Sequence, residues 1–189
     1  MSALSERYRL SPKHFADQFP QGWEFDDKVD VFEARIQGWH LDIVWSLVKR
    51  DLNVNQLAVI HLLFSYFEMI GKYTKGYLGT NRSRNYFKIG LQNVFPDIGT
   101  NEIQFMNSIY SNLRCGLYHI GRPAANVIIN DDVPAALGYN EDHDLIKISP
   151  TKLLNDIQTN FDNYITGLRN PSNPKLRENF EARFDYDNK

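Results

Sequence analysis

Residues 56–75 read QLAVIHLLFSYFEMIGKYTK, a stretch that places apolar side chains on almost every side of a helix. A helix of this kind needs neighbours all round it, so it belongs in the middle of a bundle or at an interface. Its polar exceptions follow in steps of four, three and four residues and therefore share one face: His61, Ser65, Glu68 and Lys72. We therefore expect a helical bundle built around this stretch, with one polar seam along it.

The carboxylate of Glu68 is the exception that most needs a partner, because an unpaired charge on a buried helix is costly. We expect Glu68 to pair with Lys72 one turn later, or with Arg114 from a neighbouring helix, whose guanidinium it would then orient. The alternative is that His61 and Glu68 are hydrogen-bonded within the fold and have no chemical role.

Helical spacing recurs on both sides of this stretch, at residues 26–50, 83–95, 101–120 and 150–168, with a short helix around 177–184. Asn53 or Asn55 can cap the central helix, and Ser149-Pro150 starts the last long one. Two β-prone runs, 126–130 and 145–149, are expected to pair as a small hairpin. The predicted fold class is mainly α, a bundle of four to five helices with a small β-hairpin inserted before the last long helix.

Length and composition predict one domain of ordinary size, since the chain has 189 residues and no repeat. We divide it into an irregular N-terminal lead-in (1–22), a helical domain (23–170) and a C-terminal extension (171–189). No apolar run approaches the roughly 20 residues that span a bilayer, and the start lacks a signal-peptide core, so we expect a cytoplasmic protein without membrane contact. The single cysteine, Cys115, excludes an internal disulfide and a cysteine-rich metal site.

The net charge of -2 argues against a general nucleic-acid coat protein, so any contact with RNA must be local. One candidate is the stretch 72–88, where aromatic residues alternate with five cations and no acidic residue: Lys72, Lys75, Arg82, Arg84 and Lys88. Cations there could follow the RNA backbone while the aromatic rings stack on unpaired bases. The alternative is a solvated connecting loop whose aromatic residues pack on the core.

An acidic stretch surrounds His143 and contains five carboxylates: Asp131, Asp132, Glu141, Asp142 and Asp144. Oxygen ligands suit a hard divalent cation, but a polar hairpin tip explains the same pattern. We favour the hairpin tip, and we expect neither a metal nor a cofactor.

Residues 111–123 read SNLRCGLYHIGRP and place Arg114 and His119 five residues apart, just before a helix stop at Gly121 and Pro123. Arginine is permanently charged and presents a planar fork to phosphate oxygens, while histidine titrates near neutral pH. The pair suits cleavage of an RNA phosphodiester without a metal. The alternative is a pair of basic groups that bond the free carbonyls at the helix end.

Geometry limits this interpretation, because five steps on a regular helix turn roughly 500° and leave the two side chains about 140° apart and roughly 7.5 Å apart along the axis. Gly116 could let the helix distort between them, or a twofold dimer could bring the pair of one chain against that of the other. We favour the dimer.

The chain resembles the HEPN superfamily, small helical bundles of which many are metal-independent ribonucleases. The family's characteristic motif is an arginine followed, after four to six residues, by a histidine near the end of a late helix. In this chain the two motif residues are Arg114 and His119. The flanking segments 113–114 and 116–121 also look like family usage. A second likeness is the apolar stretch 62–71, followed by a glycine-rich connection and an aromatic helix ending at Phe95-Pro96. The similarity covers roughly residues 26–168.

The resemblance implies a homodimeric endoribonuclease of a defence or toxin–antitoxin system, with single-stranded RNA, a second copy of the chain and an antitoxin protein as partners. It implies that Arg114 holds the scissile phosphate and that His119 exchanges protons, leaving a 2',3'-cyclic phosphate. Supporting roles would fall to Glu68, Cys115 and Tyr118, and RNA would be bound by Lys72, Lys75, Arg82, Arg84, Lys88 and Arg122.

One departure from the family pattern is Cys115, because active members commonly carry a polar Asn, Asp or His after the arginine and a thiol bonds weakly. The alternative function is therefore a catalytically inactive dimerising module that binds RNA, a nucleotide or a protein partner. A structural bundle without a nucleic-acid role is the third candidate.

Overall fold

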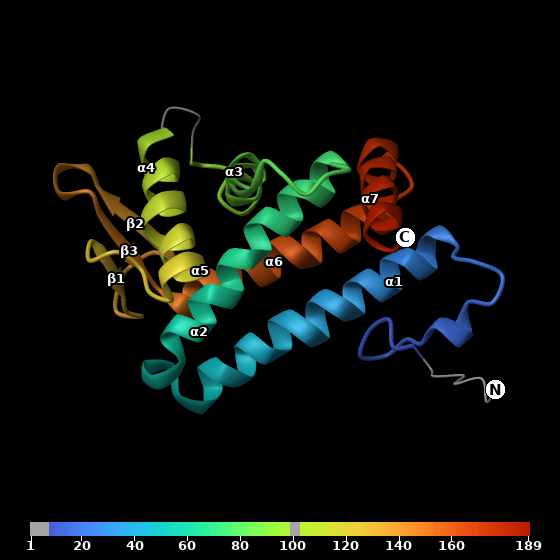
Figure 1. The fold of residues 1–189 in the computed structure, drawn as a ribbon, viewed down its shortest axis with the longest axis horizontal. Helices are drawn as coiled ribbons and strands as arrows, with labels where there is room; N and C mark the ends of the chain where they lie inside the picture. The colour runs from blue at the N-terminus through green and yellow to red at the C-terminus, as the bar shows by residue number, and fades with distance from the viewer. Residues whose placement is uncertain (1–7, 99–102) are drawn as a thin grey trace.

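Helices dominate the computed structural model, which describes residues 8–98 and 103–189 (Figure 1). The predicted fold class, a mainly helical bundle with a small β element before the last long helices, is confirmed. The α-helices are α1 (Phe25–Ile36), α2 (Asp42–Lys75), α3 (Ser83–Val94), α4 (Ile103–Ser108), α5 (Gly116–Ile120), α6 (Pro150–Arg169) and α7 (Pro174–Asp187). Wider π-helical turns, Gln37–Leu41 and Ile109–Cys115, join α1 to α2 and α4 to α5. The start expected for the helix 101–120 lies partly outside the described residues.

The first two expected helices form a long hairpin, because α2 is interrupted at Asp51. The backbone there is extended (φ -171°, ψ 102°), and the chain turns back on itself (Figure 1). The carboxylate of Asp51 accepts the backbone N–H of Val54 at 3.3 Å. The prediction that Asn53 or Asn55 caps the central helix is wrong, since a cap needs the extended backbone that Asp51 adopts.

The second part of α2 lies at the centre of the bundle, as the sequence predicts. Six of its apolar side chains are completely or almost completely buried: Val59, Ile60, Leu63, Phe64, Phe67 and Ile70. They pack in one cluster with residues of α1, α3, α6 and α7. By length and composition alone the helical stretch Phe25–Lys75 could also cross a membrane, contrary to our expectation that no run approaches that length. Many of its apolar side chains are part of the core.

Two glycines let α3 cross α2 at backbone contact. A Cβ atom added to Gly90 would lie 1.8 Å from the carbonyl oxygen of Phe67, and one added to Gly71 would lie 2.0 Å from that of Tyr86. Neither position has room for any side chain. The crossing fixes how α3, with its cations, lies over the polar seam of α2.

The small sheet holds three strands, β1 (Val127–Ile129), β2 (Leu137–Asn140) and β3 (Leu145–Ile148), in the order β1-β3-β2. The hairpin before α6 is formed by the antiparallel strands β2 and β3. The predicted pairing of 126–130 with 145–149 as a hairpin is wrong in direction, because β1 pairs with β3 in parallel. The intervening stretch supplies β2, which a short turn joins to β3 as an antiparallel pair, while β1 reaches β3 through the longer connection that a parallel pair needs.

Segments near both ends of the described chain contribute to the same core. The side chain of Ser149 accepts the backbone N–H of Lys152 at 3.3 Å and Pro150 opens α6, as expected. The C-terminal extension forms α7, which is longer than the predicted helix 177–184 and buries Phe180 and Phe184. In the N-terminal segment, Leu10 is also part of the core.

We expect Gly90→Ala to lower the free energy of unfolding by about 1–3 kcal/mol, because the added methyl group would overpack the crossing of α2 and α3. Alanine inside a helix is otherwise favoured over glycine by roughly 0.5–1 kcal/mol, so a loss isolates the effect of the crossing. Chemical denaturation measures it. Gly138→Ala is the control, since its Cβ would lie at an ordinary 3.7 Å from Lys147. A stabilised Gly90→Ala protein would contradict the crossing.

Candidate functional site

The segment that carries Arg114 and His119 is helical from Ile103 to Ile120 but not regular, because residues Ile109–Cys115 form the wider π-helical turn. The chain that leaves this helix folds back against it, and the N–H of Ala124 donates to the carbonyl of Asn112 at 2.8 Å. Gly116 permits this return, since a Cβ there would lie 2.7 Å from the carbonyl oxygen of Arg122. The expected helix stop is confirmed at Gly121, which is left-handed (φ 77°). π-Helical turns often occur at functional sites.

Asp144 ties the π-helical turn to the sheet. Its carboxylate accepts hydrogen bonds from Ser108 at 2.6 Å, Asn112 at 3.2 Å, Tyr139 at 2.8 Å and Asn126 at 3.1 Å. The hydrogen bonds from Ser108 and Tyr139 lower its pKa, so the carboxylate stays ionised. Asp144 therefore holds in place the helical segment Ile103–Ile120, which we call the motif helix.

A second carboxylate of the acidic stretch, Asp131, is also used within the fold. It accepts the hydroxyl of Ser149 at 2.8 Å and the N–H of Thr151 at 3.0 Å, at the start of α6. Asp131 therefore serves the start of α6, outside the β2–β3 hairpin, whereas Asp144 lies at the turn of that hairpin.

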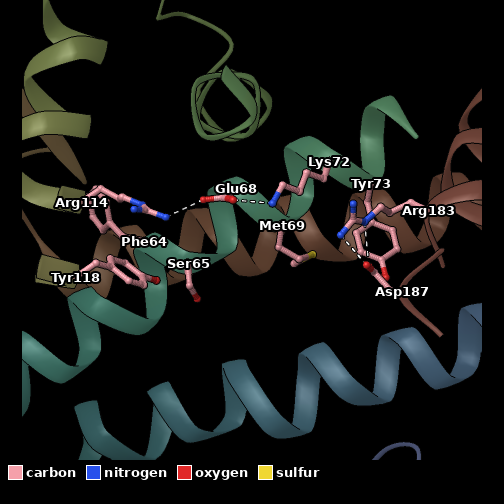
Figure 2. Close-up of a pocket in the computed structure, with 10 residues that line it drawn as sticks. All are labelled: Phe64, Ser65, Glu68, Met69, Lys72, Tyr73, Arg114, Tyr118, Arg183 and Asp187. Atoms are coloured by element: carbon pink, nitrogen blue, oxygen red, sulfur yellow. Dashed lines mark hydrogen bonds and ion pairs between the residues drawn. The ribbon is translucent and has the colours of Figure 1, made fainter. Parts of the chain in front are cut away.

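Glu68 lies between the two partners that the sequence offered and binds both of them (Figure 2). The Nη2 atom of Arg114 lies 2.9 Å from Oε2 of Glu68, and Nζ of Lys72 lies 2.6 Å from Oε1. The hydroxyl of Ser83 also donates to Oε1, at 2.8 Å. The exposed fractions of the Glu68, Arg114 and Lys72 side chains are 17%, 17% and 13%, so this is a partly buried network that orients the guanidinium.

Burial by itself would raise the pKa of Glu68, but the hydrogen bonds from Lys72 and Ser83 and the charges of Lys72 and Arg114 outweigh it. The net effect lowers the pKa below its usual value. Glu68 is therefore an anion at neutral pH and holds Arg114 by charge as well as by geometry.

Aromatic rings complete the surroundings of Arg114. Its guanidinium carbon lies 4.5 Å from the ring centre of Tyr118 and 5.5 Å from that of Tyr110. Tyr110, Arg114 and Tyr118 follow each other in steps of four and so lie along one side of the motif helix. The guanidinium carbon of Arg84, from α3, lies 5.1 Å from the ring centre of Tyr110, and Arg84 donates to the hydroxyl of Ser111 at 2.9 Å.

Four cations thus meet where α2, α3 and the motif helix come together, and we call them the Arg114 cluster: Lys72, Arg84, Lys88 and Arg114. Lys88 donates to the side-chain oxygen of Asn107 at 2.6 Å. Burial lowers its pKa, and the nearby charge of Arg84 lowers it further. Among the described residues, Glu68 is the one carboxylate that these four cations contact. The cluster therefore keeps an excess of positive charge.

A cavity of about 270 Å³ runs along this face from Tyr118 and Arg114 past Glu68 and Lys72 to Arg183 (Figure 2). Arg183 does not add free charge, because it pairs with Asp187 at 2.6 Å. It also donates to the carbonyls of Tyr77 and Gly79, which anchors the connection after α2 to α7. The basic end of this cavity is therefore the Arg114 end.

His119 lies on the neighbouring side of the motif helix. Ser111, Cys115 and His119 also follow steps of four, and together with Arg122 they line a separate cavity of about 390 Å³. The side chain of His119 is exposed. In one protomer Arg114 and His119 therefore line two different cavities, and the distortion of the helix does not bring them into one.

The remaining predicted RNA-binding residues lie outside the Arg114 cluster. Lys75 is exposed at the end of α2, Arg82 is exposed before α3, and Arg122 lies beside His119. Sequence reasoning missed Tyr110 and Ser83. Tyr110 could have been found from the sequence, because it lies four residues before Arg114. Ser83 could not, because its contact with Glu68 depends on how α3 crosses α2.

Comparisons with protein-family models, with curated proteins and with solved structures found no match. The resemblance to the HEPN superfamily therefore rests on the residues quoted above, and function has to be argued from the site itself.

We expect Glu68→Gln to lower the free energy of unfolding at pH 7 by about 1–3 kcal/mol, because it removes the charged acceptor shared by Lys72 and Arg114. The folded-state pKa of Glu68 is depressed, so its contribution is present above the unfolded-state value near 4.5 and is lost as the pH falls through the folded-state pKa. Denaturation of both proteins from pH 7 to pH 3 should show the difference shrinking.

Glu178→Gln is the matched control, since Glu178 and Lys175 form an exposed pair with exposed fractions of 70% and 74%. Such pairs contribute little, and we expect about 0.5 kcal/mol or less. An equal loss for Glu68→Gln at pH 7 and at pH 3 would mean that charge is not what Glu68 contributes.

Proposed function

We propose that the protein is a metal-independent RNA endonuclease of the HEPN type that acts as a homodimer. The observation that carries the proposal is the Arg114 cluster, in which Lys72 and Arg114 bind the carboxylate of Glu68 while Arg84 and Lys88 lie beside them. Arg114 also lies on the same helical segment as the exposed His119. The cluster supports phosphate binding, and His119 is the candidate for proton transfer.

The charges of the cluster support contact with an RNA backbone. Arg84 and Lys88 donate to the neutral oxygens of Ser111 and Asn107, so their charges are not cancelled and are available to phosphates. The ring of Tyr118 is 38% exposed next to Arg114, where an unpaired base could stack on it. Single-stranded RNA is therefore the substrate class that fits best.

The proposed cleavage is an attack of the ribose 2'-hydroxyl oxygen on the adjacent phosphorus. The new bond to the 2'-oxygen forms as the bond to the 5'-oxygen breaks, giving a 2',3'-cyclic phosphate and a 5'-hydroxyl. One His119 would accept the proton of the 2'-hydroxyl, and the other would protonate the leaving oxygen. Arg114 would stabilise the charge that develops on the phosphate oxygens. The nucleophile is part of the substrate, so alignment and proton transfer suffice.

The second copy is an essential part of this proposal, because Arg114 and His119 line different cavities in one protomer. A twofold axis close to the motif helix would let the partner's His119 approach Arg114. Ile120 supports such contact, since it exposes 72% of its surface and lines the same cavity as His119.

A second candidate is a non-catalytic dimerising module that binds RNA through the same cluster. The pairing of Arg114 with Glu68 favours it, since a guanidinium held by a carboxylate is already partly neutralised. Cys115, where active family members commonly carry a polar side chain, favours it as well. This candidate predicts binding without cleavage, and expression that is harmless to the cell.

We expect the purified protein to cleave single-stranded RNA in the presence of EDTA and His119→Ala to lose at least 100-fold of the rate, the usual contribution of a general acid or base. Arg114→Ala should lose activity as well. His14→Ala is the control, because His14 bonds Ser11 in the N-terminal segment and has no part in the motif. Electrophoresis of labelled RNA measures cleavage, and sedimentation measures the dimer. Cleavage that survives His119→Ala would remove His119 from the mechanism, while tight binding without cleavage would favour the second candidate.

We expect Arg84→Gln and Lys88→Gln to weaken RNA binding and to make its salt dependence shallower, by about 0.7 in the slope of log K against log salt for each phosphate that is no longer neutralised. Lys175→Gln is the control, since Lys175 lies on α7 and pairs with Glu178. Fluorescence anisotropy with a short labelled RNA at several salt concentrations measures both quantities. An unchanged slope in Arg84→Gln and Lys88→Gln would exclude the cluster as the phosphate site.

A further inference from the structure

The largest cavity described lies away from the Arg114 cluster and has a volume of about 710 Å³. It is lined by residues at and after the end of α3, by Phe105 of α4, by β2 and the segments on either side of it, and by Asp156 of α6. Cavities of roughly 300–1,000 Å³ are the size that small-molecule sites usually have. No role in RNA binding or cleavage involves it.

One part of the lining is aromatic and aliphatic. The rings of Phe105 and Tyr139 stack with their centres 5.1 Å apart, and Phe95 lines the same cavity. Val94, Ile98 and Leu137 add aliphatic side chains to the lining. The hydroxyl of Tyr139 is bound to Asp144, which holds that ring in position. The cavity therefore offers a fixed, partly aromatic apolar surface.

The charges of the lining are all negative. Asp97, Glu141 and Asp156 come from three separate elements, and among the described lining residues there is no lysine, arginine or histidine. None of the three carboxylates forms an ion pair or a side-chain hydrogen bond with another described residue. This distinguishes them from Asp131 and Asp144 of the same acidic stretch, whose oxygens are occupied by protein donors.

The negative charge of Asp156 is not balanced by any nearby cation of the described residues. Much of the residue is exposed, yet neighbouring atoms remove enough water from its carboxyl group to raise its pKa, and no cation offsets the effect. A positively charged ligand would favour the ionised form.

We propose that this cavity binds a small organic cation with an apolar, preferably aromatic, body. The rings would contact the body and interact with the positive charge through their faces, while Asp97, Glu141 and Asp156 would attract the ammonium group. RNA is not the ligand, because three uncompensated carboxylates repel phosphates. The proposal is therefore independent of the Arg114 cluster.

Three ligands that share one aromatic body and differ in charge test whether the cavity of the full-length protein selects a cation. Tryptamine, the neutral indole-3-ethanol and the anionic indole-3-propionate share an aromatic body and differ in the charge of the short side chain. By titration calorimetry at pH 7 we expect tryptamine to bind at least 10-fold more tightly than the alcohol, and the anion to bind most weakly. Equal affinity for the three compounds would overturn the proposal.

Substitutions then locate the binding. Glu141→Gln and Asp156→Asn should each weaken tryptamine binding about 3- to 10-fold, whereas Asp142→Asn is the matched control, because Asp142 adjoins Glu141 and does not line the cavity. Melting curves check that each variant is folded, and Asp97→Asn replaces any variant that is not. If both variants bind tryptamine as tightly as the unchanged protein, this cavity is not the site. Neither outcome depends on RNA cleavage.

Discussion

A carboxylate on a helix that is buried nearly all round must be compensated, and at Glu68 this requirement organises the site. Lys72 comes from the same helix, Ser83 from α3 and Arg114 from the motif helix, so three elements converge on two oxygens. The compensation is larger than one anion requires, since Arg84 and Lys88 lie in the same cluster. The excess cations distinguish this group from an internal salt bridge and make it a candidate for binding phosphate.

The motif helix divides its chemistry between two sides. Steps of four carry Tyr110, Arg114 and Tyr118 along one side, and Ser111, Cys115 and His119 along the next. The π-helical turn and the return of the chain over Gly116 hold this segment against the sheet without joining the two sides. Self-association is therefore the physical condition on which an Arg/His nuclease site depends, and the binding role of the Arg114 cluster does not share that condition.

The acidic stretch shows how similar residues acquire different roles. Asp131 and Asp144 are surrounded by donors that the sheet and α6 present, so they are structural. Glu141 lies three residues before Asp144 but faces a cavity that contains aromatic rings and no cation among its described lining residues. What separates these carboxylates is the set of groups placed opposite them by the fold.

Local sequence determined the central position of 56–75, the Gly121 stop and the Ser149-Pro150 start of α6, because helical periodicity and caps act over short distances. It also showed that Glu68 needs a partner and named Lys72 and Arg114 as the candidates. It did not determine that both of them bind Glu68, that β1 joins β3 in parallel, that Asp51 rather than an asparagine caps the central helix, or that Tyr110 contacts two guanidinium groups. Those features depend on how distant segments pack. Gly71 and Gly90 set the crossing that brings α3 to the motif helix, and only the assembled bundle decides which side of that helix each side chain faces.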